Sequence, residues 1–226
     1  ANAFWADSIR ATRYSHHLLQ VRRLGSIGTD GGRAAPGTLA EIAVESNESG
    51  AWVGIASTNP VPASTRFSAV DWLGNTYCAV GGGGMFKIVN GVGTVWTEPP
   101  PSRFIELHYE KLWAFSQVFD LNGLRHTDTN SSTSWPTVAA PTGGNGGTMY
   151  VGRGYAYLPT GIKSAFGNLY LWTEGDLWIL FGTDNTNFNL QRAHPGAGTL
   201  SHESIARMDN GMIWHDGLGD RILWLM

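Results

Sequence analysis

One short segment near the C-terminal end, residues 168–181, constrains the fold of this chain more than any other. It reads NLYLWTEGDLWILF, so two runs of alternating aromatic and aliphatic residues flank Glu174, Gly175 and Asp176. Alternation with a period of two is typical of a β-strand, and a polar triplet containing glycine is typical of a tight turn. The segment therefore predicts a β-hairpin that exposes Glu174 and Asp176 at its polar tip.

Similar units recur along the chain. Aligned on the turn, residues 72–80, 108–116, 165–173 and 208–216 read WLGNTYCAV, HYEKLWAFS, AFGNLYLWT and MDNGMIWHD. A helical repeat would show a period of 3.6 inside each unit, whereas these units alternate. An irregular spacing of roughly forty residues is what four-stranded propeller blades with unequal loops leave.

These repeats predict an all-β chain that forms a β-propeller of about five blades. In this interpretation residues 168–181 are the inner strand pair of one blade. Five blades of roughly forty residues need about 200 residues, so a complete and an incomplete propeller both fit the chain length.

Composition agrees with this fold class and narrows the function. The chain has 30 glycines, 10 prolines and 10 tryptophans but only 15% charged residues, which favours turns and aromatic strands over helices. The net charge of −3 provides no overall positive field for binding nucleic acid. The single cysteine, Cys78, excludes an internal disulfide and lies in an apolar run that predicts a buried, inert thiol. The apolar runs are too short to span a membrane.

The first 38 residues differ from the rest and predict a basic, extended N-terminal arm. Solvated arginines on an arm or an edge strand pair are one interpretation, and docking on an acidic partner or on nucleic acid is the other. The candidate contact residues for such docking are Arg10, Arg13, Arg22 and Arg23. Residues 39–226 then form the propeller, with Gly/Pro-rich loops between blades near residues 59–63, 98–101 and 141–147.

Patterns that would indicate catalysis or metal binding are weak. The nucleophile elbow Gly-x-Ser-x-Gly is absent, and the seven histidines lack zinc-site spacing. Asp128, Asn130 and Ser132 alternate as at the start of a calcium loop, without the glycine and the distal glutamate that complete it. We therefore predict no catalytic residue, no metal and no cofactor, and expect these side chains to build turns.

Residues 123–136, GLRHTDTNSSTSWP, resemble the Asp-box turn of sialidase-type propellers. Counting back from Trp135 places Asn130 where the aspartate should stand and Ser132 where the glycine should stand. The degraded match indicates a structural turn of a blade. Most tryptophans are expected in the core between blades, and Trp135, near a turn, is a candidate for stacking on a sugar or a partner.

Residues 161–226 resemble the propeller region of the tail nozzle and packaged-DNA stabilisation proteins, which lie at the head-to-tail junction of short-tailed bacteriophages. The matching positions, which are expected to be structural, are Phe181, Gly182, Thr183, Asp184, Phe188, Leu190, Gly198, Ser201, Ser204, Ile205, Gly211, Trp214, Asp216 and Gly217. The runs RFIELHYEKLWAF and RHTDTNSSTSWP also fit, so the resemblance covers about residues 102–226.

This resemblance implies a non-enzymatic structural protein of the virion, at the tail or the head-to-tail junction. It implies a homo-oligomeric ring that contacts portal, adaptor or tail proteins, retains packaged double-stranded DNA and passes it at ejection. Two alternatives stay open. A carbohydrate-binding or glycoside-processing propeller would gather Trp, Arg and Glu in a concave pocket. A scaffold propeller would bind only protein partners.

Overall fold

The computed structural model describes residues 12–14, 17–23, 40–45, 52–55, 67–80, 84–89, 92–139, 142–216 and 222–225, with side chains only between residues 68 and 216. Nearly all regular structure in these ranges is β-strand, and the only helical element among them is the 3-10 turn η1 (His202–Ser204). The predicted all-β class is confirmed. None of the residues in these ranges forms a helix long and apolar enough to cross a bilayer.

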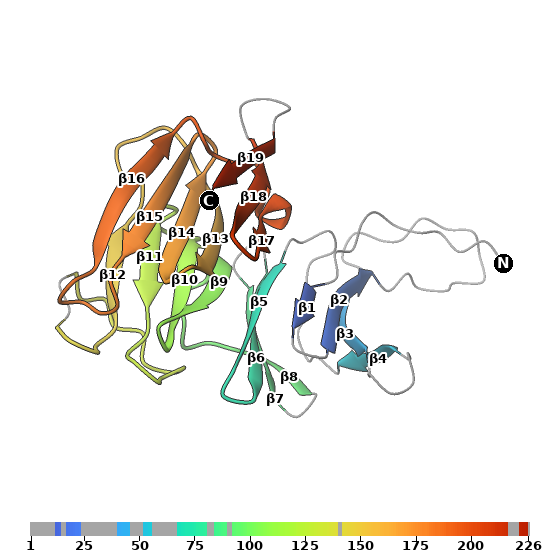
Figure 1. Cartoon of the computed structure of the whole chain (residues 1–226). Helices are drawn as coiled ribbons and strands as arrows, with labels where there is room; N and C mark the ends of the chain where they lie inside the picture. The colour runs from blue at the N-terminus through green and yellow to red at the C-terminus, as the bar shows by residue number, and fades with distance from the viewer. Residues whose placement is uncertain are drawn as a thin grey trace.

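The described strands form four four-stranded sheets and one three-stranded sheet, all antiparallel and each built from strands consecutive in the sequence (Figure 1). The first sheet contains β1 (Thr12–Tyr14), β2 (His17–Arg23), β3 (Ala40–Glu45) and β4 (Trp52–Ile55). The second contains β5 (Phe67–Trp72), β6 (Asn75–Val80), β7 (Gly84–Val89) and β8 (Val92–Val95).

The third sheet contains β9 (Ser102–His108), β10 (Lys111–Gln117), β11 (Gly123–His126) and β12 (Gly147–Tyr150). The fourth contains β13 (Pro159–Ala165), β14 (Asn168–Thr173), β15 (Asp176–Phe181) and β16 (Asn189–Pro195). The three-stranded sheet contains β17 (Ala206–Met208), β18 (Gly211–His215) and β19 (Ile222–Leu225). The four aligned sequence units lie at the turns after β5, β9, β13 and β17, so the repeat is real.

The first strand of a sheet is the one that meets neighbouring sheets. Strand β9 contacts β5 of the second sheet and β13 of the fourth sheet. Residues 168–181 form β14 and β15, which are the two central strands of the fourth sheet. They are therefore the inner strand pair of a four-stranded sheet, as the sequence predicts. The nearly continuous burial along β14 is what a central strand requires.

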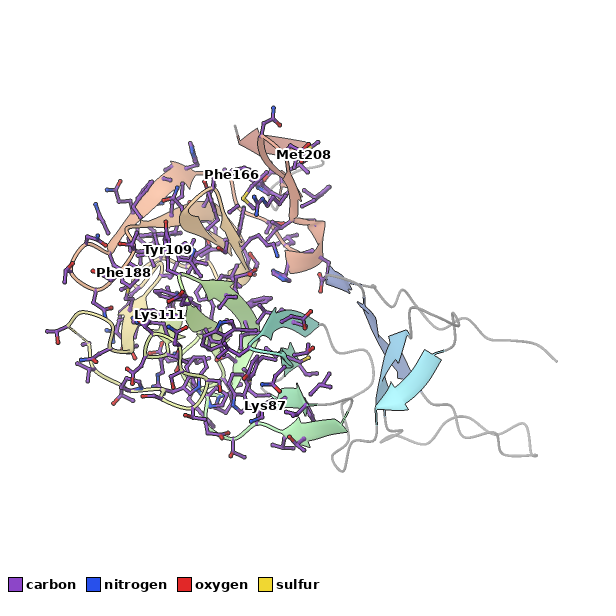
Figure 2. The ribbon with its side chains drawn as sticks, turned by 60° about the horizontal axis from the view of Figure 1, so that its bottom comes forward. Lys87, Tyr109, Lys111, Phe166, Phe188 and Met208 are labelled. Carbon is purple, nitrogen blue, oxygen red and sulfur yellow. The ribbon has the colours of Figure 1, made fainter. Side chains whose placement is uncertain are left out.

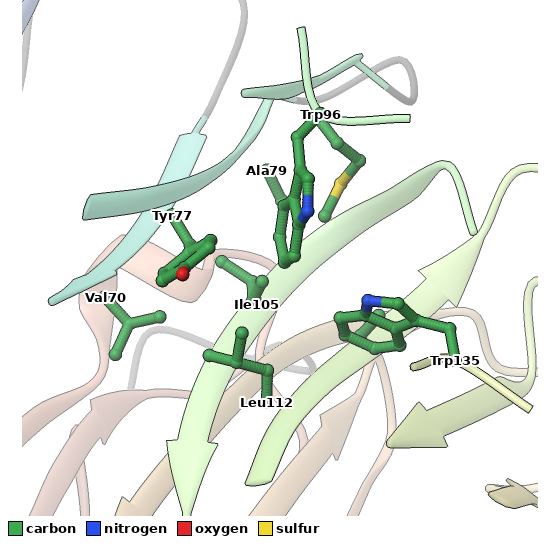
Figure 3. Packing of buried hydrophobic residues seen from close by; sticks show 9 residues of the cluster. Val70, Tyr77, Ala79, Trp96, Ile105, Leu112 and Trp135 are labelled. Atoms are coloured by element: carbon green, nitrogen blue, oxygen red, sulfur yellow. The ribbon is translucent and has the colours of Figure 1, made fainter. Parts of the chain in front are cut away.

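Aromatic side chains fill the space between successive sheets. Between the second and third sheets, Tyr77, Trp96 and Trp135 form a chain of rings with centroids 4.7 Å and 5.6 Å apart (Figure 3). Trp113 and Trp172 occupy the same role in the next two layers, where both are fully buried. Each such side chain stabilises the fold by about 1.5–3 kcal/mol through burial of apolar area. Successive sheets therefore pack face to face around shared aromatic cores.

The single cysteine lies on a central strand of the second sheet. Cys78, on β6, is 1% exposed, and burial raises the pKa of its thiol to about 12. The predicted burial of this residue is confirmed.

The predicted arm and loops are described only in part. Strands β1 and β2 lie within residues 1–38. Strand β1 pairs with β2, and β2 pairs with β3, so this part of the predicted arm belongs to a β-sheet. Arg13 lies on β1 and Arg22 and Arg23 on β2, whereas Arg10 and residues 59–63 lie outside the described residues. Residues 98–101 join the second sheet to the third. Residues 142–146 join β11 to β12 within one sheet, whereas the sequence predicted a loop between blades there.

Candidate functional site

Polar side chains join the first strands of successive sheets. The Oγ atom of Ser68, on β5, accepts a hydrogen bond of 2.7 Å from the backbone N–H of Ile105, on β9. The Glu106 carboxylate, also on β9, lies 3.2 Å from Lys163 Nζ on β13 and accepts a bond from the Ser164 backbone N–H. An edge strand leaves N–H groups unpaired, and these side chains satisfy them. They form a polar seam between the sheets.

The titratable groups of this seam are shifted by burial. Burial raises the pKa of Glu106, and the nearby Lys163 ammonium opposes the shift. Burial lowers the pKa of His108 and His202 to about 4, so both imidazoles are neutral near pH 7. His108 Nδ1 lies 2.9 Å from Ser164 Oγ, and His202 Nδ1 accepts a bond of 3.4 Å from a backbone N–H of β13. These groups hold strands together. Within the described ranges no group of three or more His, Cys, Asp and Glu side chains is placed to hold a metal ion.

A buried lysine holds the long connection between β11 and β12. Lys111, the first residue of β10, is 1% exposed, and its Nζ donates to the backbone oxygens of Thr127, Gly144 and Asn145. Asn185, from the fourth sheet, donates from Nδ2 to the same loop, including a bond of 2.7 Å to Gly143 O. Burial lowers the pKa of Lys111. The Lys111 side chain thus binds the carbonyl groups that converge in this loop.

In the same loop, Asp128 has the role that the Asp-box comparison assigned to Asn130. The Asp128 carboxylate accepts hydrogen bonds from Ser134 Oγ and from the Gly146 N–H, which together lower its pKa. Asn130 instead donates 3.1 Å to Glu110 Oε2. A shallow hollow of about 330 Å³ lies beside Asp128. Trp135 is 8% exposed in the core and is not available to stack on a ligand.

The described residues that match the phage proteins lie in turns and strands of the last two sheets. Phe181 ends β15, and Gly182 follows with φ of +101°, where an added Cβ would overlap the Asn187 backbone. The Asn187 side-chain oxygen accepts from the N–H groups of Thr183 and Asp184 at 2.8 and 3.0 Å. This hydrogen-bonded turn shows no arrangement for calcium, and its polar side chains are directed at the backbone.

The C-terminal half of the match follows the same pattern. A Cβ on Gly198 would overlap the backbone of Glu174, so the two loops touch there. Ser204 Oγ donates 2.8 Å to Ser201 O, and Trp214 Nε1 donates 3.2 Å to the backbone oxygen of residue 197. Asp216 is 1% exposed, and Gly217 lies outside the described residues.

The expected exposure of the hairpin carboxylates is wrong for Asp176. Asp176 is 1% exposed, lies 2.7 Å from Arg192 Nη2 on β16, and accepts a bond of 3.3 Å from the Gly196 N–H. Its side chain therefore folds back under the turn, because a neighbouring strand supplies a cation. Glu174 accepts a separate bond of 3.2 Å from the Leu158 N–H. The two carboxylates have different partners and do not act as a pair.

A feature that the sequence interpretation missed lies at the aligned turns. Leu73, Tyr109 and Phe166 are the first residues of the two-residue turns after β5, β9 and β13, and all three are exposed, by 62%, 41% and 41%. Their φ angles are +50°, +45° and +47°, in the left-handed region that bulky residues rarely adopt. Met208, 40% exposed, precedes the turn after β17. We call Leu73, Tyr109, Phe166 and Met208 the turn face.

Figure 2 shows Met208, Phe166 and Tyr109 following one another across the view. The signal was present in the sequence, because a large apolar residue begins three of the four aligned turns in place of the usual Asn or Gly. The alternation along the strands alone does not indicate these exposed turn residues.

Comparison with known proteins gives the fold. No protein-family model and no curated protein sequence matches the chain. Among solved structures, the chain resembles BamB from Moraxella catarrhalis, a β-propeller, with a TM-score of 0.54 and 9% identity over 95% of this chain. The chain spans 57% of the length of that structure.

Two weaker likenesses have TM-scores below 0.5. An α-L-arabinofuranosidase from Clostridium thermocellum gives 0.46 at 12% identity, over 91% of this chain and 80% of that structure. The computationally designed Ika8 protein gives 0.45 at 9% identity, over 96% of this chain and 70% of that structure. What the comparisons establish is the similarity of the chain to a β-propeller.

Proposed function

We propose that this chain is a non-enzymatic β-propeller subunit that works by assembling with other macromolecules, as a structural component of a phage tail or head-to-tail connector. In this proposal each of the five sheets is a blade, and the basic N-terminal region contributes β1 and β2 to the first blade. The expected partners are portal, adaptor or tail proteins, further copies in a ring, and double-stranded DNA passing through the channel of the virion.

One observation carries the non-enzymatic part of the proposal. The side chains best suited to chemistry are already bonded to other parts of the fold: Glu106 to Lys163, Asp176 to Arg192, and Lys111 to three backbone carbonyls. A catalytic acid or base needs an open position for a substrate atom within about 3 Å. These groups hold adjacent strands and loops together, which favours a structural role.

The phage assignment is supported by the sequence resemblance of residues 102–226. The described residues of that match lie in turns and strands of the last two sheets, and several of them make the hydrogen bonds that shape those turns, which suits a structural framework. A slightly acidic surface suits a channel that conducts DNA without retaining it, because retention requires many lysine and arginine contacts with phosphate.

A scaffold propeller with protein partners only is a second candidate, and the turn face favours it. The glycan alternative has less support, since Trp135, the described candidate for stacking on a sugar, is buried.

Native mass spectrometry together with negative-stain imaging tests the proposal. The expected result is a closed ring of several copies. A monomer that binds or hydrolyses glycans would overturn the proposal, and a monomer that binds only proteins would leave the scaffold candidate.

A further inference from the structure

We propose that the turn face binds an apolar segment of another protein in which lysine or arginine residues flank the apolar side chains. This inference rests on the proposed assembly function and adds the surface and the chemistry of the partner.

The first support is the backbone conformation of the turns. A side chain with a Cβ in the left-handed region costs about 1–2 kcal/mol, and Asn or Gly usually takes this position. Leu73, Tyr109 and Phe166 each adopt it while they remain exposed. Contacts within the chain leave a large part of each side chain in solvent, and burial of that part against a partner would offset the cost. Strain of this kind gathers at binding sites.

The second support is that neighbouring turns contact one another through their side chains. The Tyr109 hydroxyl donates a hydrogen bond of 3.1 Å to the backbone oxygen of Gly167, in the next turn. The Arg207 guanidinium lies 5.2 Å from the centroid of the Phe166 ring, which brings in the three-stranded sheet. The His108 ring packs against Tyr109 with centroids 4.4 Å apart. The aromatic side chains are thus held in place before any partner binds, which lowers the entropy lost on binding.

The third support is the charge beside the turns. Glu110 and Asp209 are exposed turn residues, and the nearby Arg207 is stacked on Phe166. The ionisable groups on these turns are therefore mostly acidic. Two copies of this face would repel one another, and so would duplex DNA. Lysine or arginine beside an apolar residue of the partner complements this pattern.

The test uses substitutions that the turns tolerate. Asparagine readily adopts the left-handed conformation, so Leu73→Asn, Tyr109→Asn and Phe166→Asn remove the apolar side chains without adding strain. Binding of two labelled synthetic peptides to the full chain is measured by fluorescence anisotropy, one alternating Leu and Lys and the other alternating Leu and Glu. We expect the Lys peptide to bind about tenfold more tightly than the Glu peptide.

The triple Asn variant should lose about tenfold in affinity for the Lys peptide and keep its melting temperature or increase it. The matched control is Phe119→Asn, because Phe119 is 92% exposed but lies in the connection between β10 and β11. This control should bind the Lys peptide as the unchanged chain does. If the triple variant folds poorly, the single Tyr109→Asn and Phe166→Asn variants provide the same comparison.

Three results would overturn the inference: equal binding of both peptides, no loss of binding in the Asn variants, or binding of duplex DNA that those variants abolish. The proposed function fails separately. A closed ring that binds both peptides equally would support the assembly function and contradict the proposed binding surface. A monomer that prefers the Lys peptide would contradict the connector function and support the binding surface.

Discussion

Two connections between neighbouring antiparallel strands differ in how much the rest of the chain stabilises them. The loop from β11 to β12 encloses Lys111 and Asp128, and its backbone groups are bonded to these side chains. The turn after β5 places Leu73 in solvent at 62% exposure and in a strained conformation. The first connection is stabilised from inside the chain. The second receives a bond of 3.3 Å from Asn75 Nδ2 to Leu73 O, but the Leu73 side chain stays in solvent, which fits the proposed role of the turn face.

The largest effect of a single substitution is expected where the long loop loses the Lys111 ammonium. Lys111→Met keeps the length of the side chain but removes the charged donor that three backbone oxygens share, so the free energy of unfolding should fall by about 1.5–3 kcal/mol. Chemical denaturation measures this change. The matched control is Lys87→Met on β7, which should stay within about 0.5 kcal/mol of the unchanged chain. Equal effects of the two substitutions would show that the loop does not depend on Lys111.

Close packing of polar loops is tested at Gly198. Gly198→Ala puts a methyl group into the backbone of Glu174, so we expect the free energy of unfolding to decrease by about 2 kcal/mol. Gly196→Ala is the control, since Gly196 has a φ of +78° but open space around it, and should cost about 1 kcal/mol from conformation alone. A reversed order of the two melting temperatures would contradict this packing.

Acid should weaken the third sheet. The pKa values of His108 and His126 are about 4 in the folded chain and about 6.5 when unfolded, so the unfolded state binds more protons between these values. Stability is therefore fully present above pH 6.5 and is lost as the pH falls towards 4, by about 1–3 kcal/mol per histidine.

Thermal melts from pH 7 to pH 4 measure this loss. His126→Phe keeps a ring against Trp113 and Phe188 and should flatten the pH dependence. An unchanged slope would assign the acid sensitivity to other groups.

The smallest effect is predicted at the turn face. Leu73→Asn should increase the free energy of unfolding by up to about 1 kcal/mol, because asparagine relieves the left-handed strain. Phe119→Asn, at an exposed position with no such strain, should change it by less than about 0.5 kcal/mol. A loss of stability in Leu73→Asn would make the turn face a structural feature and remove the contrast between the two connections.

The fold could be predicted to the level of strands and turns. Each aligned unit holds a two-residue turn, and the closing pairs Trp72–Asn75, His108–Lys111 and Ala165–Asn168 are those of the structure. Side-chain alternation is a local property, so it survives in the sequence. The apolar run at 168–181 accordingly forms the two inner strands of its sheet, whereas the contacts between sheets depend on residues far apart in the sequence.

The polar interior could not be predicted for the same reason. Asp176 is buried because Arg192, on the next strand, supplies a cation. Lys111 is buried because carbonyls 33 and 34 residues away converge on it. An acidic residue beside a glycine looks exposed when only its neighbours in sequence are considered. The strained turn residues can be recognised from the sequence, because a bulky residue at the first turn position breaks the local preference for Asn or Gly.

The buried thiol of Cys78 gives this protein a reporter of its own opening. Because the chain has one cysteine and its side chain is 1% exposed, a thiol-reactive dye can reach it only when the sheet of β5 to β8 opens. The labelling rate under native conditions then reports the free energy of that local opening, with no engineered probe. The opening of one sheet can thus be followed from a single sulfur atom.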